Sequence, residues 1–278
     1  MATPDRSTGP GPAEGAVHRP PPLLAVFGLL AVVEITAVAL RWPALQWATK
    51  PLLAPVLALH LWRRTGDRHT RVLAGLGFAT AGDVALLVPG PAAFGIGIAF
   101  FLGAQLCWIS AFVGQGAVPY LRARRTLCLA YAAVWAVAVA ALVPSLDAVL
   151  AGAIAVYSMA LVGMALTAHV MGPRAALGGG VFVLSDLLIG LGAAGLDFTG
   201  RPVLVMTTYA AALFLLTTAF ADDRGPVAGG TAPAGLPGRP REDGTSGAAA
   251  PAHGGVPGRG AGSEGAGTGG ADVSGSTR

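Results

Sequence analysis

Residues 79–90 read ATAGDVALLVPG, and residues 181–191 read VFVLSDLLIGL. In each stretch one aspartate, Asp83 or Asp186, stands among apolar residues without a charged neighbour nearby in the sequence. The whole chain of 278 residues is 54% hydrophobic and 12% charged, whereas soluble domains carry about twice that charge. The two stretches therefore predict membrane-spanning helices that each hold a carboxylate inside the bilayer.

Eight apolar segments, counting these two, approach the length of roughly 20 residues that a helix needs to cross a bilayer. They span residues 23–40, 44–62, 72–88, 92–113, 127–143, 148–170, 175–194 and 202–220. Residues 1–22 and 221–278 are rich in Gly, Ala, Pro and Ser, and are predicted to be disordered because they cannot bury enough apolar surface to offset their ordering entropy. The sequence thus predicts an all-α, polytopic membrane protein whose eight-helix transmembrane domain spans residues 23–220.

Arginines gather in every second connection between the apolar segments. These connections hold Arg63, Arg64, Arg68, Arg71, Arg122, Arg124, Arg125 and Arg174. The opposite connections hold only Arg41 and Arg201. The positive-inside rule therefore places both termini, and the Gly/Ala/Pro-rich tail, in the cytoplasm. The net charge of +4 is explained by arginines in these connections, so it does not indicate nucleic-acid binding. The abundance of Ala, Gly, Pro and Arg is typical of a GC-rich bacterium, which predicts a bacterial plasma membrane.

Five polar side chains are predicted to lie at one depth in the membrane. Asp83 follows Arg71 by twelve residues, and Asp186 follows Arg174 by twelve. At 1.5 Å per residue, both carboxylates lie roughly 18 Å from the cytoplasmic edge. The remaining three members fall at nearly the same level: Glu34, Lys50 and Tyr209. The sequence therefore predicts one polar layer inside the bundle.

Ionisable groups inside a membrane favour a functional role by default, and the alternative is that they only bond neighbouring helices. Lys50 is the only lysine of the chain. It is either the counter-charge of one of the carboxylates, Asp83, Asp186 or Glu34, or it reaches the outer interface. Glu34 is equally compatible with the site and with a structural partnership. Three further side chains are candidates for the site or for interhelical hydrogen bonds: Gln105, Tyr157 and Ser185.

Two close carboxylates in a low dielectric do not both ionise easily, so one of them keeps a proton. The pair then offers a general acid and a general base at neutral pH. Such a pair suits hydration of an acid-labile bond, and the substrate accessible inside a membrane is a lipid or a transmembrane peptide. The two cysteines, Cys107 and Cys128, indicate neither a disulfide framework nor a metal site. No metal and no cofactor are predicted.

Short motifs along the chain resemble those of the YhhN/TMEM86 family. They are Thr49-Lys50-Pro51-Leu52, Gly82-Asp83, Phe182-x-x-Ser185-Asp186, Tyr209-x-x-Ala212, and Tyr157 with Met164. The resemblance covers about residues 23–220. It implies a lysoplasmalogenase, which hydrolyses the vinyl ether bond of a lysophospholipid substrate to a fatty aldehyde and a glycerophospho-headgroup. It also implies that Asp83 and Asp186 are the catalytic pair, that Lys50 and Tyr209 support them, and that no metal or organic cofactor takes part.

The chain departs from this family pattern at three positions. The family often has His where this chain has Gln105, Tyr where it has Trp108, and Gln where it has Leu213. If these residues hold the headgroup or the water, substrate choice or activity differs in this member.

Two other functions are compatible with the residues. An intramembrane aspartyl protease also uses two membrane aspartates, but residues 80–83 lack the Gly-x-Gly-Asp pattern of that class and no Pro-Ala-Leu motif follows Asp186. A proton-coupled transporter or lipid carrier would use the ionisable residues of the layer as a relay. These are Glu34, Lys50, Asp83 and Asp186. Vinyl ether hydrolysis is preferred because its acid and base steps match a carboxylate pair.

Overall fold

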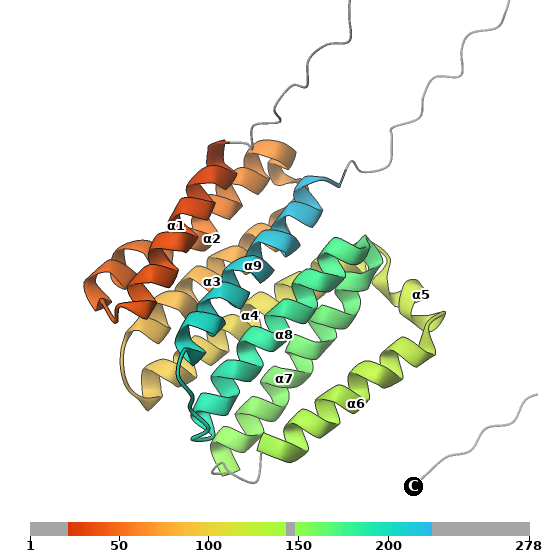
Figure 1. Ribbon diagram of the computed structural model, residues 1–278. Helices are drawn as coiled ribbons and strands as arrows, with labels where there is room; N and C mark the ends of the chain where they lie inside the picture. Colours follow the sequence, from red (N-terminus) through yellow and green to blue (C-terminus); the bar gives the residue numbers. More distant parts are fainter. Residues whose placement is uncertain (1–21, 143–147, 224–278) are drawn as a thin grey trace, which may run out of the picture. The chain divides into compact units, whose positions relative to one another are not determined.

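A computed structural model describes residues 22–142 and 148–223, and the regular structure of these residues is entirely helical. The helices are α1 (Pro22–Ala39), α2 (Pro43–Thr65), η1 (Gly66–His69), α3 (Thr70–Leu87), α4 (Pro91–Gly114), α5 (Ala117–Arg122), α6 (Arg125–Leu142), α7 (Ala148–Ala168), η3 (His169–Met171), α8 (Pro173–Ala193) and α9 (Arg201–Ala221). The predicted all-α fold is confirmed (Figure 1). The short α5 and the 3-10 turns η1 and η3 were not predicted.

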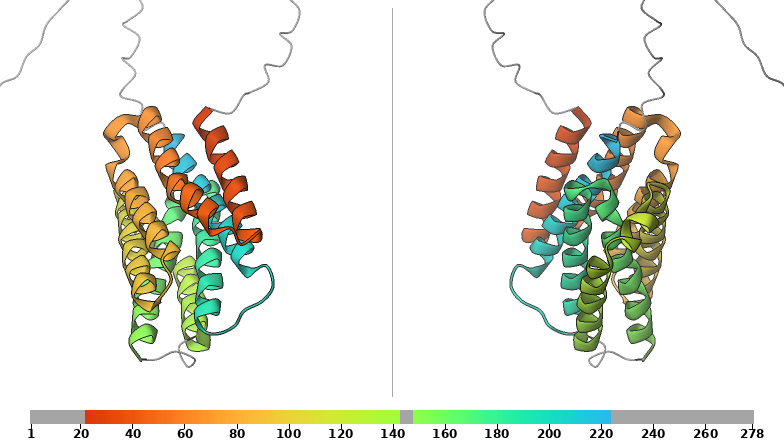
Figure 2. Two further views of the ribbon diagram at one scale, coloured as in Figure 1. Left: turned by 90° about the vertical axis from the view of Figure 1, so that its left-hand side faces the viewer. Right: turned by 90° about the vertical axis from the view of Figure 1, so that its right-hand side faces the viewer.

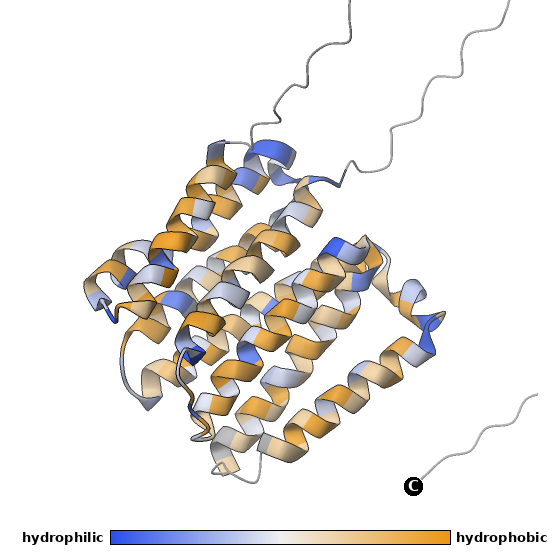
Figure 3. Cartoon of the chain, in the orientation of Figure 1, coloured by the Kyte–Doolittle hydropathy of each residue, from blue (hydrophilic) through white to orange (hydrophobic). Residues whose placement is uncertain are grey.

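Six segments of the described chain are long and apolar enough to cross a membrane. One of them, Pro43–Leu87, runs through α2, η1 and α3, and Arg125–Ala141 is a shorter apolar helix. Apolar residues cover most of each helix, whereas hydrophilic residues gather at the helix ends (Figure 3). The chain is therefore a helical integral membrane protein. Its eight crossings, and the cytoplasmic location of both termini, remain predictions.

Proline marks where several helices begin. Pro43, Pro91 and Pro173 are the first residues of α2, α4 and α8. Proline is favourable there because the first helical N–H has no partner within the helix. Pro51 and Pro55 lie inside α2, which nevertheless runs without a break to Thr65. Each inner proline lacks the N–H that would donate to the carbonyl four residues earlier.

Helix α9 helps to join the two halves of the chain. It packs closely against α8, its neighbour in sequence, and also against α1 and α2 from the other end of the chain. Figure 1 shows α9 between the α1–α2 pair and α8. Helix α6 lies at the far edge, where it packs mainly against α7. The return of α9 brings residues from its middle against the N-terminal helices.

Small residues allow two of the helix pairs to approach closely. A Cβ atom at Gly179 of α8 would lie 2.7 Å from the Cα atom of Ala165 on α7. A Cβ atom at Gly82 of α3 would lie 2.8 Å from the ring of Phe101 on α4. Both distances are shorter than a carbon–carbon contact allows, so glycine is needed at these positions. Small residues at helix interfaces are a common feature of membrane bundles.

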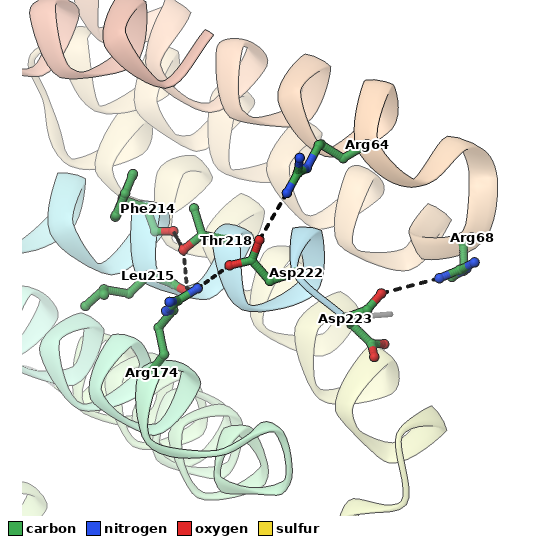
Figure 4. A network of polar contacts seen from close by, with 8 residues as sticks. All are labelled: Arg64, Arg68, Arg174, Phe214, Leu215, Thr218, Asp222 and Asp223. Atoms are coloured by element: carbon green, nitrogen blue, oxygen red, sulfur yellow. Dashed lines mark hydrogen bonds and ion pairs between the residues drawn. The ribbon is translucent and has the colours of Figure 1, made fainter. Parts of the chain in front are cut away.

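A polar network ties the end of α9 to three other elements (Figure 4). Asp222 forms ion pairs with Arg64 of α2, at 3.3 Å, and with Arg174 of α8. The backbone carbonyl of Asp223 accepts a hydrogen bond from Arg68 at 3.3 Å. We call this the arginine-rich end of the bundle. The start of α1 and the end of α9 both lie there (Figure 2).

Sequence analysis assigns residues 1–22 and 221–278 to disordered segments. Pro22 begins α1, Ala221 ends α9, and Asp222 and Asp223 take part in the network just described. The other residues of the two segments lie outside the described part of the chain.

Candidate functional site

Asp83 lies at the centre of a buried cluster formed by three helices. It belongs to α3, and its side chain is 1% exposed. The hydroxyl of Tyr209 on α9 donates a hydrogen bond of 2.6 Å to Asp83 Oδ2. The Nζ atom of Lys50 on α2 lies 3.6 Å from Asp83 Oδ1. Of the alternatives open for Lys50, the structure thus assigns it to Asp83.

Asp186 forms a second pair with a different tyrosine. It lies on α8, and its Oδ2 atom accepts a hydrogen bond from the hydroxyl of Tyr157 on α7. Each of the two aspartates therefore accepts a hydrogen bond from one tyrosine hydroxyl. Unlike Asp83, Asp186 has no ion pair with a lysine or arginine among the described residues.

Tyr209 lies near both aspartates. Its ring is held edge-on by Phe101 of α4 and Phe182 of α8, with both centroid distances at 5.8 Å. It is hydrogen-bonded to Asp83 and is also within electrostatic range of Asp186. Asp83 itself contributes to the electrostatic environment of Asp186. The two pairs thus form one connected polar layer across α2, α3, α7, α8 and α9.

A further carboxylate extends the layer towards α1. Glu34 is fully buried, and its Oε2 atom accepts a hydrogen bond of 2.5 Å from the hydroxyl of Thr49 on α2. Its other carboxylate oxygen has no hydrogen-bond partner among the residues that the structure describes. Glu34 also interacts electrostatically with the neighbouring Lys50. Sequence analysis placed Glu34 at this depth but assigned no role to Thr49, although Thr49 directly precedes the lysine on the same helix.

The remaining predicted residues have different surroundings. Gln105 is fully buried on α4 beside the Tyr157 hydroxyl, but neither of its amide atoms makes a hydrogen bond of good geometry with a described residue. The hydroxyl of Ser185 donates to the Val205 carbonyl at 3.1 Å. Ser185 therefore joins α8 to α9 and does not hydrogen-bond to an aspartate.

An apolar cavity of about 120 Å³ reaches the Asp186 pair. Its walls come from α3, α4, α6, α7 and α8, and include Phe94, Ile98 and Trp135. Asp186 and Tyr157 are among the few polar side chains in its lining, whereas Asp83 does not line it. The indole N–H of Trp135 donates to the Ser158 hydroxyl oxygen at 3.1 Å, which fixes the indole in the cavity wall. The two aspartates are therefore unequal, since an apolar ligand in this cavity would meet Asp186 first.

Metal ligands do not cluster in the described part of the chain. No group of three or more His, Cys, Asp or Glu residues lies within reach of one ion there. Cys107 and Cys128 are free thiols. The carboxyl, phenol, amide and ammonium groups of the layer can transfer protons and stabilise charge.

The fold and this layer define a helical membrane protein with paired acidic residues buried among its helices. Residues 45–220 match the model of the YhhN family. Because this match covers more than half of the chain, the protein belongs to the YhhN family, and the resemblance seen in the short motifs is confirmed. No curated protein and no solved structure matches the chain.

Proposed function

We propose that the protein hydrolyses the vinyl ether bond of a lysoplasmalogen or a closely related lysolipid. The observation that carries the proposal is the position of Asp186, which is hydrogen-bonded to Tyr157 and lines an apolar cavity beside the buried Asp83 cluster. The cavity would hold the first carbons of the alkenyl chain and place the ether bond at the carboxyl group. Membership in the YhhN family fits this activity.

Charge balance within the layer supports an acid–base role. The layer contains three carboxyl groups, Glu34, Asp83 and Asp186, and one ammonium group, Lys50. If all were ionised, two negative charges would remain uncompensated among apolar helices, at a cost of several kcal/mol by approximate insertion scales. Lys50 favours the ionised form of Asp83, its ion-pair partner. We therefore assign one retained proton to Asp186 and another to Glu34, because neither carboxyl group forms an ion pair among the described residues.

The proposed reaction begins with transfer of the Asp186 proton to the vinyl carbon that is not bonded to the ether oxygen. This leaves an oxocarbenium ion, whose positive charge the ionised aspartates stabilise. Water then adds to the cationic carbon and releases a proton to the carboxylate pair, which restores the acid. The resulting hemiacetal breaks its carbon–oxygen bond to give a fatty aldehyde and the free hydroxyl of the glycerophospho-headgroup. One water molecule is consumed for each bond broken.

A paired-substrate assay tests this function. Purified protein in detergent micelles is incubated with a 1-alkenyl lysophospholipid or with the matched 1-alkyl lipid, and free aldehyde is measured. We expect aldehyde from the alkenyl lipid alone, with none from Asp186→Asn. The control Asp67→Asn removes an exposed carboxylate of η1 outside the layer and should retain activity. A folded wild-type protein that releases no aldehyde would exclude the proposal.

Proton-coupled transport is the second candidate. The observation that favours it is the burial of the Glu34 carboxylate. The hydrolysis steps give no part to this fully buried carboxylate. In a transporter, Glu34 would exchange protons with the Lys50–Asp83 pair. Protein in liposomes containing a pH-sensitive dye would then show substrate-dependent proton uptake, without aldehyde. Loss of that uptake in Glu34→Gln would support transport, whereas aldehyde release without proton uptake would exclude it.

A further inference from the structure

Several buried polar atoms on α4 and α9 make no hydrogen bond of good geometry within the described part of the chain. They are both amide atoms of Gln105, the indole Nε1 of Trp108 and the hydroxyl of Thr217. The three side chains are at most 1% exposed. Buried polar groups without a partner are rare because desolvation is costly, and those that persist usually bind ordered water. These atoms therefore point to a hydrated path inside the bundle.

The three residues lie between the Tyr157–Asp186 pair and the arginine-rich end. Gln105 lies beside Tyr157. On α4, Trp108 follows Gln105 by about one helical turn. The rings of Trp108 and Phe220 are 5.8 Å apart. At the arginine-rich end, the His69 ring lies 5.1 Å from the same phenylalanine. Thr217 precedes Phe220 by one turn of α9.

Thr217 differs from the other buried threonines of the described helices. The hydroxyls of Thr167 and Thr218 each donate to a backbone carbonyl one turn earlier, and the Thr49 hydroxyl donates to Glu34. This local bond is the usual partner of a threonine in a helix. Thr217 makes no such bond, although it is fully buried. Its hydroxyl is therefore available to a partner outside its own helix.

We propose that Gln105, Trp108 and Thr217 bind a short chain of water molecules that leads from the arginine-rich end to the Tyr157–Asp186 pair. The inference rests on the proposed function, because hydrolysis consumes water and the other approach to Asp186 is an apolar cavity. Lipid would reach Asp186 through the cavity, while water would reach it past Gln105. Gln105 is then a positioning residue for the attacking water.

Radical footprinting tests hydration without relying on catalysis. Hydroxyl radicals are generated by a brief X-ray pulse in ¹⁸O-labelled water, and oxidation is mapped by mass spectrometry. We expect ¹⁸O incorporation at Trp108, although its side chain is 1% exposed. Incorporation no greater than at Phe182, another side chain with 1% exposure, after correction for intrinsic reactivity, would overturn the proposal.

Two glycines of α3 provide a substitution that should block the water path at Trp108 and a control substitution that should not. A methyl group at Gly75 would lie 3.1 Å from Trp108 Nε1, whereas one at Gly77 would have no atom within 4 Å. Gly75→Ala should lower the Trp108 labelling severalfold and reduce kcat, while Gly77→Ala should change neither. Equal labelling in the two variants would contradict the proposed path.

Two adjacent threonines provide a variant that tests the water path and a matched control. Thr217→Val replaces the unpartnered hydroxyl with a methyl group of similar size, and Thr218→Val does the same at a hydroxyl bonded to its own helix. If Thr217 binds water, its replacement should lower the melting temperature and reduce kcat roughly tenfold with little change in KM, the scale of one lost hydrogen bond. A Thr217→Val protein that is more stable than wild type would show a dry site. Labelled Trp108 in a protein that releases no aldehyde would retain the water path and reject the hydrolase.

Discussion

The Tyr209 hydroxyl donates a hydrogen bond of 2.6 Å to Asp83, which lies 126 positions earlier in the chain. The contact exists because α9 returns to pack beside α2 after contacting α8. The Tyr209 ring is fixed between Phe101 and Phe182, so the hydroxyl is aimed before any ligand binds. A carboxylate that receives an oriented hydroxyl and an ammonium group is preorganised, which is the condition for electrostatic stabilisation of a cation.

Removing either tyrosine hydroxyl should slow turnover while the ring stays in place. We expect Tyr209→Phe and Tyr157→Phe each to lower kcat about 10- to 100-fold, because a hydrogen bond to a charged group contributes about 1.5–3 kcal/mol. Aldehyde release measured at saturating lipid reports the change. Tyr131→Phe is the matched control, since the Tyr131 hydroxyl pairs with His169 outside the layer. Unchanged kcat in both site variants would remove the tyrosines from the chemistry.

The two aspartates should differ in their effect on stability, although either substitution should abolish turnover. Asp83→Asn leaves Lys50 without its counter-charge, and breaking a buried ion pair costs about 3–5 kcal/mol. Asp186→Asn removes a carboxyl group that has no such partner among the described residues. Thermal unfolding in detergent should therefore show a larger loss for Asp83→Asn, partly recovered by adding Lys50→Met. Equal melting temperatures for the two single variants would argue against a charged Lys50–Asp83 pair.

Substitution of Gly192 should displace a guanidinium group, because that group occupies the adjacent space. A Cβ atom at Gly192 would lie 2.4 Å from Arg201 Cζ. Arg201 donates to the Leu188 carbonyl at 3.2 Å and to Asp197 at 2.8 Å, which joins the start of α9 to the end of α8. Gly192→Ala should displace Arg201 and lower the melting temperature by a few degrees, roughly the effect of 1 kcal/mol.

Gly180 provides the control for that substitution. It lies on the same helix, and an added methyl group there would have no atom within 4 Å. Gly180→Ala should leave the melting temperature unchanged or raise it slightly, because alanine is the better helix former. Equal effects at the two glycines would show that the guanidinium moves aside freely.

Asp222 should stabilise the bundle in a manner that depends on salt. It pairs with two arginines on different helices, but its side chain is 52% exposed. Exposed ion pairs contribute about 0–1 kcal/mol each, and salt screens them. Asp222→Asn should therefore lower the melting temperature modestly at low ionic strength and hardly at all in about 1 M salt. A loss that is the same at both salt concentrations would mean that packing, not charge, is responsible.

Both termini are expected to lie in the cytoplasm because of the arginines at one end of the bundle. A reporter that is active only in the cytoplasm, fused after Arg278, should be active in whole cells. A second fusion within the α8–α9 connection, residues 194–200, should be inactive because that connection lies at the opposite end. Activity of the second fusion alone would reverse the orientation and move the proposed water entrance to the outer face.

Sequence patterns were sufficient for the positions of the long helices but not for the turns between them. Runs of apolar residues and prolines at helix starts fix the elements to within a few residues, since both effects are local. The short α5 and the two 3-10 turns have no comparable signal, because a single turn depends on how the chain joins two packed helices. Pro51 and Pro55 would suggest a break in α2, yet packing keeps that helix continuous.

For the site, the depth of the residues in the membrane remains a prediction, and the sequence could not predict their partners. Matched spacing from Arg71 and Arg174 placed Asp83 and Asp186 in one layer, because helical rise is constant. The choice of Asp83 as the partner of Lys50, and of Tyr157 as the partner of Asp186, depends on the rotation of each helix about its axis. That rotation is decided by packing between helices distant in sequence. For the same reason the Glu34–Thr49 bond was missed.

The isolation of Lys50 has a practical consequence. Because the chain contains one lysine, it carries one ε-amine, and that amine lies 3.6 Å from Asp83 with 16% of its side chain exposed. Reductive methylation with ¹³C-labelled formaldehyde would therefore introduce one internal dimethylammonium reporter, distinct in chemical shift from the terminal amine. Its resonance would follow the protonation of the buried layer during substrate binding, so the protein carries a built-in probe at the place where its charge state matters most.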